Sequence, residues 1–139
     1  METSFVLWIA RIRKAIRCEF ETMATPLDIT VAQHQVLRRL WEGDGILTSA
    51  LTKDICSDGG TMTGILDRLE TKGLVYRKRC ADDRRAVRIF LTPAGHDLKA
   101  PLMEIIGTIN ERVLDGFSPE ERQQLLRLLE RAGGNLGIA

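Results

Sequence analysis

The sequence predicts a mainly α-helical protein with one small β-hairpin, which places it in the α+β class. Two observations predict this class. Apolar residues recur at spacings of three and four along most of the 139 residues, as they do in amphipathic helices. Over residues 74–91 the pattern changes to an alternation of apolar and polar residues on both sides of a charged turn, as in two paired strands.

The chain begins with a long amphipathic helix, predicted over residues 1–25. Pro26 ends or interrupts this helix, because proline lacks the N–H group that a helix interior requires. A second helix is predicted from Thr30, which forms a capping box with Gln33, and it ends before Gly43. The apolar stripe of the first helix consists of Phe5, Trp8, Ile9, Ile12, Ile16, Phe20 and Met23.

Two shorter helices are predicted next, over residues 49–56 and 60–72. Between them lies a polar, glycine-rich turn. Gly73 ends the second of these helices, because glycine readily adopts the left-handed conformation that often follows a helix C-terminus. The buried face of that helix is expected to consist of Met62, Ile65, Leu66 and Leu69.

The hairpin is predicted from two strands, residues 74–79 and 86–91, which a charged turn connects. After the second strand, Thr92 and Pro93 supply a cap and a first helical residue, so one long helix is expected to begin there. It is predicted to continue as far as Gly116.

A last helix is predicted from Ser118 to about Gly133. Ser118 is a cap residue, a proline follows it, and Glu121 completes a capping box three positions later. The whole predicted architecture is therefore two helical ends around a central set of short helices and a hairpin.

Positive charge is concentrated in and around the hairpin. The formal net charge of the whole chain is only +1, yet residues 72–88 contain seven basic side chains and two acidic ones. A local basic cluster on a nearly neutral chain indicates a confined face for a polyanion, although a solvated charged hairpin is the simpler alternative. The charged residues are Lys72, Arg77, Lys78, Arg79, Arg84, Arg85 and Arg88, with Asp82 and Asp83.

Two short helices joined by a turn and followed by a hairpin are the layout of a winged helix-turn-helix. The second helix of such a pair fits the major groove of DNA, and small or hydroxyl-bearing residues near its start allow a close approach to the bases. The sequence therefore predicts that DNA is contacted by Ser49, Gly60, Thr61, Thr63, Gly64, Arg68, Lys72, Arg77, Asp83, Arg84 and Arg85.

The tip of the hairpin, residues 82–85, carries two aspartates and two arginines. An arginine on a protruding loop can enter a narrow minor groove, where the negative potential is enhanced. We expect Asp83 to hold one arginine side chain in a fixed pose through a charge-assisted hydrogen bond. The alternative is that the Asp–Arg pair only stabilises the turn.

The two end segments, residues 1–25 and 93–135, would leave apolar stripes exposed in a monomer. Pairing with a second copy would bury those stripes, at roughly 25 cal/mol per Å² of apolar area. A two-fold homodimer would present two recognition helices about 10 base pairs apart. The expected partners are therefore a second copy of the chain and double-stranded DNA with a pseudo-palindromic operator.

The central part of the chain resembles the multiple antibiotic resistance regulator (MarR) family of winged helix-turn-helix transcriptional regulators. The resemblance implies one domain over residues 1–139, with a DNA-binding lobe over 30–92 and dimerisation helices over 1–25 and 93–135. The matching residues lie within 57–98 and are Thr61-Met62-Thr63, Leu66-Asp67-Arg68-Leu69-Glu70-Thr71-Lys72-Gly73-Leu74-Val75, Arg77, Asp83-Arg84-Arg85 and Leu91-Thr92-Pro93-Ala94-Gly95.

The resemblance also implies a mode of action. Most members of the family are repressors that a small, often aromatic or phenolic, anionic ligand releases from DNA, and Arg85 matches the minor-groove arginine of the wing. Gly64 departs from the family, because relatives often carry Arg or Asn there, so no operator sequence can be carried over. The implied effector pocket has as candidates Ile12, Arg13, His34, Leu37, Arg38 and Trp41, although His34 and Trp41 can equally be core residues.

Two alternative functions remain open at this point. A redox-sensing regulator could use Cys18, which lies near Lys14 and Arg17 and so in an electropositive setting. The oxidant-sensing relatives place their cysteine nearer the start of the first helix, and Cys80 beside the wing is a weaker candidate. A winged-helix adaptor that binds another protein is the second alternative, and the basic wing argues against it.

The sequence carries no sign of an enzyme, a cofactor or a metal site. It contains no glycine-rich phosphate loop and no nucleophile elbow, and His34 and His96 have no partners at metal-ligand spacing. The three cysteines, Cys18, Cys56 and Cys80, are expected to be free thiols. We expect a cytoplasmic protein, because no apolar run is long enough to cross a membrane and the N-terminal charges follow the apolar stretch.

Overall fold

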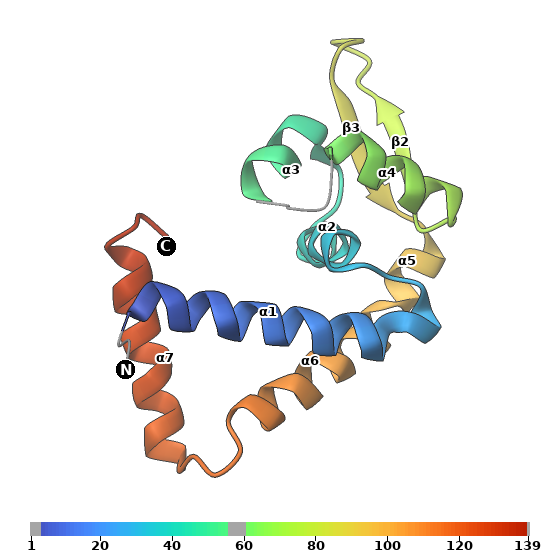
Figure 1. Ribbon diagram of the computed structural model, residues 1–139. Helices are drawn as coiled ribbons and strands as arrows, with labels where there is room; N and C mark the ends of the chain where they lie inside the picture. Colours follow the sequence, from blue (N-terminus) through green and yellow to red (C-terminus); the bar gives the residue numbers. More distant parts are fainter. Residues whose placement is uncertain (1–3, 56–60, 139) are drawn as a thin grey trace. The chain divides into compact units, whose positions relative to one another are not determined.

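A computed structural model of the chain describes residues 4–55 and 61–138 and confirms the mainly helical, α+β class (Figure 1). Two compact units are distinguished, Met1–Ile106 and Gly107–Ala139. The elements are α1 (Phe5–Ala24), a short 3-10 helix (Thr25–Leu27), α2 (Val31–Trp41), β1 (Ile46–Leu47), α3 (Thr48–Asp54), α4 (Met62–Thr71), β2 (Val75–Arg79), β3 (Val87–Leu91), α5 (Pro93–Asp97), α6 (Lys99–Val113) and α7 (Pro119–Gly134).

Helix α2 begins where the sequence predicts. The Thr30 side chain accepts a hydrogen bond from the Gln33 N–H at 3.2 Å, and the Gln33 side chain accepts one from the Thr30 N–H at 3.3 Å. This reciprocal pair satisfies two N–H groups that have no partner within the helix. The expected capping box is therefore confirmed.

The hairpin is part of a three-stranded antiparallel sheet with β3 in the centre. Val75 pairs with Leu91 and Arg79 pairs with Val87, which confirms the predicted hairpin. On the other side of β3, Ile46 of β1 pairs with Ile89. The sequence does not predict β1, because two residues are too few to produce a visible alternation.

The core of the first unit lies between α2, α4 and the sheet, with α3 packed against it. Helix α2 contacts both β3 and α4, and α3 contacts β1, α4 and β3. This packing holds the two short helices and the hairpin on one rigid core. Its fully buried side chains include Val36, Leu37, Leu40, Leu51, Leu66, Leu69, Ile89 and Leu102.

The long helix predicted from Pro93 to Gly116 is instead two helices, α5 and α6. Helix α5 ends at Asp97, and Leu98 separates it from α6. Pro101 supplies the physical reason: it has no N–H to donate to the carbonyl four residues earlier, and its ring crowds that carbonyl. The expectation of one uninterrupted helix was therefore wrong.

The second unit consists of the end of α6 and all of α7. The predicted capping box is confirmed, since Ser118 accepts from the Glu121 N–H at 3.1 Å and Glu121 accepts from the Ser118 N–H at 2.9 Å. Arg122 fixes the turn between the helices, because it binds Glu111 at 3.0 Å and donates to the Leu114 carbonyl at 3.2 Å. In the part of the chain that the structure describes, no helix is both long and apolar enough to cross a membrane.

Candidate nucleic-acid interface

Helix α4 presents its first turn to solvent. Three buried side chains, Ile65, Leu66 and Leu69, anchor one face of the helix to the core. Thr61 is the cap residue, and its hydroxyl oxygen accepts a hydrogen bond from the Gly64 N–H at 3.2 Å. The Thr61 hydroxyl hydrogen is still available as a donor. Among the predicted DNA-contacting residues, Ser49, Thr61, Thr63 and Arg68 are exposed and Gly64 is half-buried, while Gly60 lies outside the described residues.

Helix α3 is held against the sheet by a hydroxyl group. Thr48, at the start of α3, donates from its side chain to the Val87 carbonyl of β3 at 3.3 Å. This bond places the exposed Ser49 beside the start of β3, at the end of the hairpin that adjoins its turn. The start of α3, the start of α4 and the hairpin therefore border one surface.

Arg77 connects the hairpin to α4. Its guanidinium Nη2 lies 2.6 Å from the Asp67 carboxylate and 3.3 Å from the Thr63 carbonyl oxygen. Thr63 belongs to the exposed first turn of α4. Arg77 is half-buried. These bonds fix α4 relative to β2, so Arg77 positions the helix, and its direct contact with DNA stays a prediction.

Lys72 makes an equivalent connection at the other end of α4. Its ammonium group donates to the Gln33 side chain at 2.9 Å and to the main-chain carbonyl of Asp28, and it lies 3.4 Å from the Asp28 carboxylate. Because these partners belong to the segment before α2 and to its first turn, Lys72 ties that segment to α4. Lys72 therefore positions α4, and its contact with DNA stays a prediction.

The tip of the hairpin is fixed by bonds to main-chain groups. The Asp83 carboxylate accepts from the Arg85 N–H at 2.9 Å, and Arg79 donates from its guanidinium to the Arg84 carbonyl at 3.2 Å. We expected Asp83 to bind an arginine side chain, and the structure places this bond on the main chain instead. Asp83 thus shapes the turn from which Arg84 and Arg85 project.

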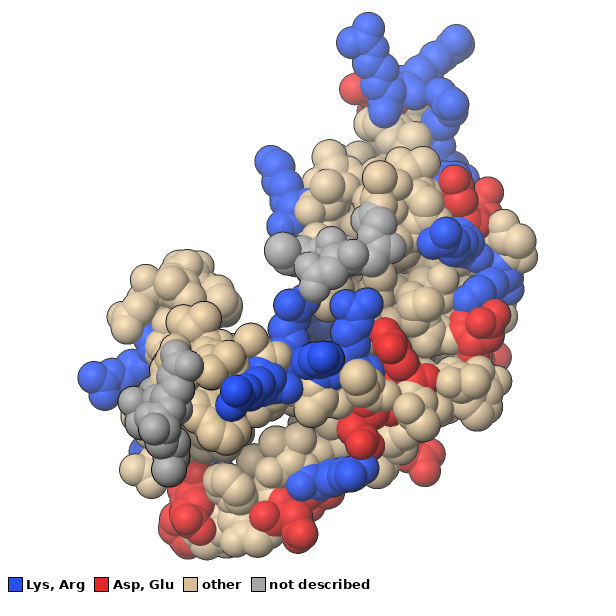
Figure 2. All heavy atoms as spheres, in the orientation of Figure 1, with Lys and Arg blue, Asp and Glu red and all other residues tan. Residues whose placement is uncertain are grey.

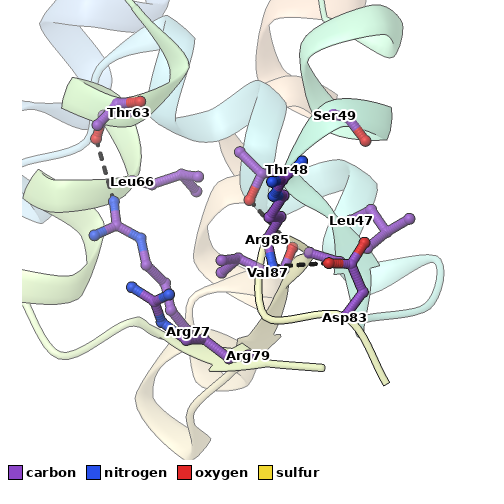
Figure 3. Close-up of a pocket in the computed structure, with 11 residues that line it drawn as sticks. Leu47, Thr48, Ser49, Thr63, Leu66, Arg77, Arg79, Asp83, Arg85 and Val87 are labelled. Carbon is purple, nitrogen blue, oxygen red and sulfur yellow. Dashed lines mark hydrogen bonds between the residues drawn. The ribbon is translucent and has the colours of Figure 1, made fainter. Parts of the chain in front are cut away.

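A hollow of about 670 Å³ lies between α3, α4 and the hairpin (Figure 3). Three arginines and one aspartate border it, together with hydroxyl groups and apolar side chains. Arg79 was absent from the sequence prediction, although its spacing of two from Arg77 places both on the same face of β2. The lining residues are Leu47, Thr48, Ser49, Thr63, Leu66, Arg77, Arg79, Asp83, Arg85, Ala86 and Val87.

Basic side chains gather at the free end of the hairpin. Figure 2 shows Lys and Arg side chains that project from this end, at the top of the view, with few acidic neighbours. The exposed basic residues of the hairpin are Lys78, Arg79, Arg84, Arg85 and Arg88. A protruding cationic loop beside an exposed helix start is suited to binding a polyanion.

The residues of the implied effector pocket divide into two groups. Leu37 is fully buried in the core, and the Trp41 indole donates to the Gly95 carbonyl at 3.0 Å, so both contribute to packing. Ile12, Arg13 and Arg38 are exposed. Arg13 also borders a small hollow of about 170 Å³ along α1, with Ala10, Lys14 and Arg17.

His34 is a buried imidazole at the contact between α1 and α2. Its ring lies 4.9 Å from that of Phe20 and 6.0 Å from that of Trp41. Its Nε2 atom is buried and has no hydrogen-bond partner in the described part of the chain. Burial, and then the positive charge of Arg38, lower the pKa of His34 below its usual value.

Stability is expected to fall as the pH drops because of His34. The folded chain keeps this imidazole neutral, whereas the unfolded chain binds a proton below about pH 6.5, so the unfolded state gains protons first. The stability contribution is therefore complete above about pH 6.5 and is lost on acidification toward the lowered pKa of the folded state. Urea unfolding at about pH 7.5 and about pH 5 measures it, and His34→Phe should show a smaller loss. An equal loss in both proteins would contradict this assignment.

Two of the cysteines lie in the described residues. Cys18 is exposed on α1 and Cys80 is half-buried at the end of β2, and both are free thiols. Cys56 lies outside the described residues. Within residues 4–55 and 61–138, no three His, Cys, Asp or Glu side chains are close enough together to hold a metal ion.

Comparisons with known proteins agree with this geometry. A MarR family model matches residues 29–87. The organic hydroperoxide resistance transcriptional regulator of Bacillus subtilis (strain 168) is 36% identical over 91 residues, which cover 66% of this chain and 62% of that protein, less than two thirds of its length.

Solved structures match over nearly the whole chain. A MarR transcriptional regulator from Methanosarcina mazei Go1 superposes with a TM-score of 0.85 at 28% identity, covering 94% of this chain and 95% of that one. The apo form of wild-type MarR from E. coli gives a TM-score of 0.82 at 26% identity, covering 95% and 98%. The chain therefore has the winged-helix fold predicted from its sequence; residues 29–87 match the MarR family model, and the whole chain is similar in structure to MarR family regulators.

Proposed function

We propose that this protein is a homodimeric, sequence-specific regulator of transcription that binds double-stranded DNA in the cytoplasm and has no enzymatic activity. The observation that carries the proposal is the single surface formed by the exposed start of α4, the start of α3 and the basic hairpin. In this account α4 is the recognition helix and the β2–β3 hairpin is the wing.

The first turn of α4 is suited to reading bases. The major groove accommodates a helix, and the N-terminal residues of a recognition helix contact the base edges. Thr61 and Thr63 are exposed there and can donate to acceptors or place a methyl group against thymine. Arg68, further along α4, is exposed where it can reach a phosphate.

The wing is suited to the minor groove. Arg84 and Arg85 project from a turn that Asp83 and Arg79 hold in one shape, so little conformational entropy is lost when DNA binds. A narrow minor groove attracts arginine through its enhanced negative potential. Arg85 also borders the hollow beside α4, which places it at the same surface as the recognition helix.

The apolar residues left exposed on the terminal helices support a homodimer. On α1 these are Phe5, Val6, Trp8, Ile9 and Ile12, and on α7 they are Leu126, Leu128 and Leu129. Clusters of exposed apolar side chains of this kind mark interaction surfaces. A two-fold pair would present two copies of α4 to successive turns of the major groove, which implies a pseudo-palindromic operator.

We further propose that the protein is a repressor that a small anionic ligand releases from DNA. The exposed Arg13 and Arg38, with Ile12, are the residues proposed to contact this ligand. Thermal-shift titration with an aromatic carboxylate tests this, because a ligand that binds only the folded state raises Tm. The name of the B. subtilis relative refers to organic hydroperoxide resistance, so oxidation of the exposed Cys18 is the second candidate for regulation.

DNA affinity is expected to fall steeply with salt. Each phosphate that a lysine or arginine neutralises releases counterions, so a dimer making six or more such contacts should lose on the order of 10³-fold in affinity between about 50 and 200 mM salt. Fluorescence anisotropy with labelled duplex DNA across this salt range measures the slope. A flat response would contradict DNA binding through the wing and would favour a protein-binding adaptor.

A further inference from the structure

Gly64 occupies an unusual position for glycine, inside the first turn of α4. It lies three residues after the cap Thr61, and helical periodicity places it away from the buried stripe formed by Ile65, Leu66 and Leu69. Glycine lowers helix stability relative to alanine, because it loses more backbone freedom on folding. A glycine on the outer face of this helix therefore needs a reason.

The fold itself does not require glycine at this position. The backbone of Gly64 does not have a positive φ, and a Cβ atom built there would meet only the Thr61 hydroxyl oxygen, at an ordinary contact distance of 3.4 Å. The other described glycines of the DNA-binding lobe and of α5, which follows it, differ: Gly43, Gly45 and Gly73 have positive φ, and a Cβ on Gly95 would collide with the Leu74 carbonyl. In the described lobe, Gly64 is therefore the only glycine that neither its backbone conformation nor the packing around it requires.

The residues beside Gly64 indicate what the lack of a side chain at this position allows: a closer approach of α4 to DNA. The exposed Thr61 and Thr63 flank it, and both carry hydroxyl groups that are short compared with the side chains of arginine or glutamine. A hydrogen bond to a base edge requires about 2.7–3.2 Å between donor and acceptor. Short hydroxyl side chains satisfy this distance only if the helix backbone lies deep in the groove.

We propose that Gly64 is a specificity-determining position: the absence of a side chain there seats α4 deep in the major groove and so brings Thr61 and Thr63 to the base edges. This inference rests on the proposed DNA-binding function. Alanine at position 64 would hold the helix away from the bases but would leave the wing and its phosphate contacts in place. Sequence-specific affinity should then fall more than non-specific affinity.

The test compares wild-type protein with Gly64→Ala. A pool of duplexes randomised over about 20 base pairs, two turns of the helix, is enriched with the wild-type protein, and the dissociation constants of both proteins are measured on the enriched duplex and on a scrambled one. We expect Gly64→Ala to bind the enriched duplex about 10-fold or more weakly and the scrambled duplex within about 3-fold of wild type. Its Tm should rise by about 2–4 °C, which excludes misfolding as the cause.

Gly107→Ala is the matched control, because Gly107 is an exposed glycine of α6 with open space around it. Because Gly107 lies in the predicted dimerisation segment, elution from a sizing column at the wild-type volume must first show that the dimer is intact; both dissociation constants should then be unchanged. Equal or tighter binding of the enriched duplex by Gly64→Ala would overturn the role of Gly64 while leaving the proposed function intact. If the wild-type protein enriches no sequence, the proposed function fails, and the role of Gly64 fails with it.

Discussion

Replacing Arg85 with alanine is expected to weaken specific DNA binding by about 10- to 100-fold. Arg85 projects from a turn whose shape Asp83 fixes through the main chain, and it borders the hollow between the wing and α4. Its removal takes away one cation per wing from the minor groove, where the negative potential is strongest. Anisotropy titration with the enriched duplex measures the loss.

The control for this variant is Arg17→Ala, which removes the same charge from an exposed position on α1, where Arg17 pairs with Glu21 at 3.0 Å. It should retain DNA affinity to within a few-fold. Arg85→Ala should elute from a sizing column at the same volume as wild type, since the wing contributes nothing to the proposed dimer contacts. Unchanged affinity in Arg85→Ala would exclude Arg85 as the minor-groove arginine.

Replacing Gly95 with alanine is expected to lower the free energy of unfolding by about 2–4 kcal/mol. Gly95 is buried in α5, and a Cβ atom there would overlap the main-chain carbonyl of Leu74 and lie 3.0 Å from Cδ2 of Leu91. Because the first of these obstacles is backbone, a side-chain rotation cannot relieve the overlap. The same residue accepts the hydrogen bond from the Trp41 indole, so displacement of α5 would weaken that bond as well.

Urea unfolding followed by circular dichroism measures this change, with Gly107→Ala as the matched control. Gly107 also lies within a helix but has no neighbouring atom within 4 Å of the added Cβ. Its replacement should be neutral or slightly stabilising. If Gly95→Ala and Gly107→Ala unfold at the same urea concentration, the close approach of α5 to Leu74 is not a constraint on the fold.

Much of the fold could be predicted because its signals are local. The capping boxes at Thr30 and Ser118 each lie within four residues of sequence, and both form as predicted. The hairpin is visible in the sequence as an alternation of apolar and polar residues on both sides of a charged turn, and the two strands pair as a hairpin in the structure. Strand β1 could not be seen in this way, because it has only two residues and exists through its pairing with β3.

The break between α5 and α6 was missed although its signal is local. Pro101 lies inside the stretch predicted as one helix, and the continuing apolar stripe of that stretch outweighed it in the prediction. A proline near the start of a helix is compatible with that helix only if a new first turn begins there. Pro101 therefore predicts the break between α5 and α6 if it is given more weight than the apolar stripe.

The interface was predicted less completely than the fold, because its side-chain pairings connect distant parts of the chain. Lys72 and Arg77 are basic residues near a recognition helix, and composition alone suggests phosphate contacts for both. Lys72 is instead bonded to Gln33, 39 residues earlier, and Arg77 is bonded to Asp67 across the gap between β2 and α4. Charge and position in sequence do not distinguish a lysine that binds DNA from one that positions the helix.

Hydroxyl-radical footprinting on the enriched duplex tests the central proposal most directly, because this reagent cleaves DNA from the minor groove. The account predicts two-fold symmetric protection at the minor grooves where the two wings lie, flanking major-groove contacts spaced by about one helical turn. Arg85→Ala should lose the minor-groove protection, whereas protection of guanine N7 against dimethyl sulfate, which reports contacts in the major groove, should remain. Wild-type protection that is absent or asymmetric, or minor-groove protection that is unchanged in Arg85→Ala, would contradict the assignment of α4 and the hairpin as one DNA-reading surface.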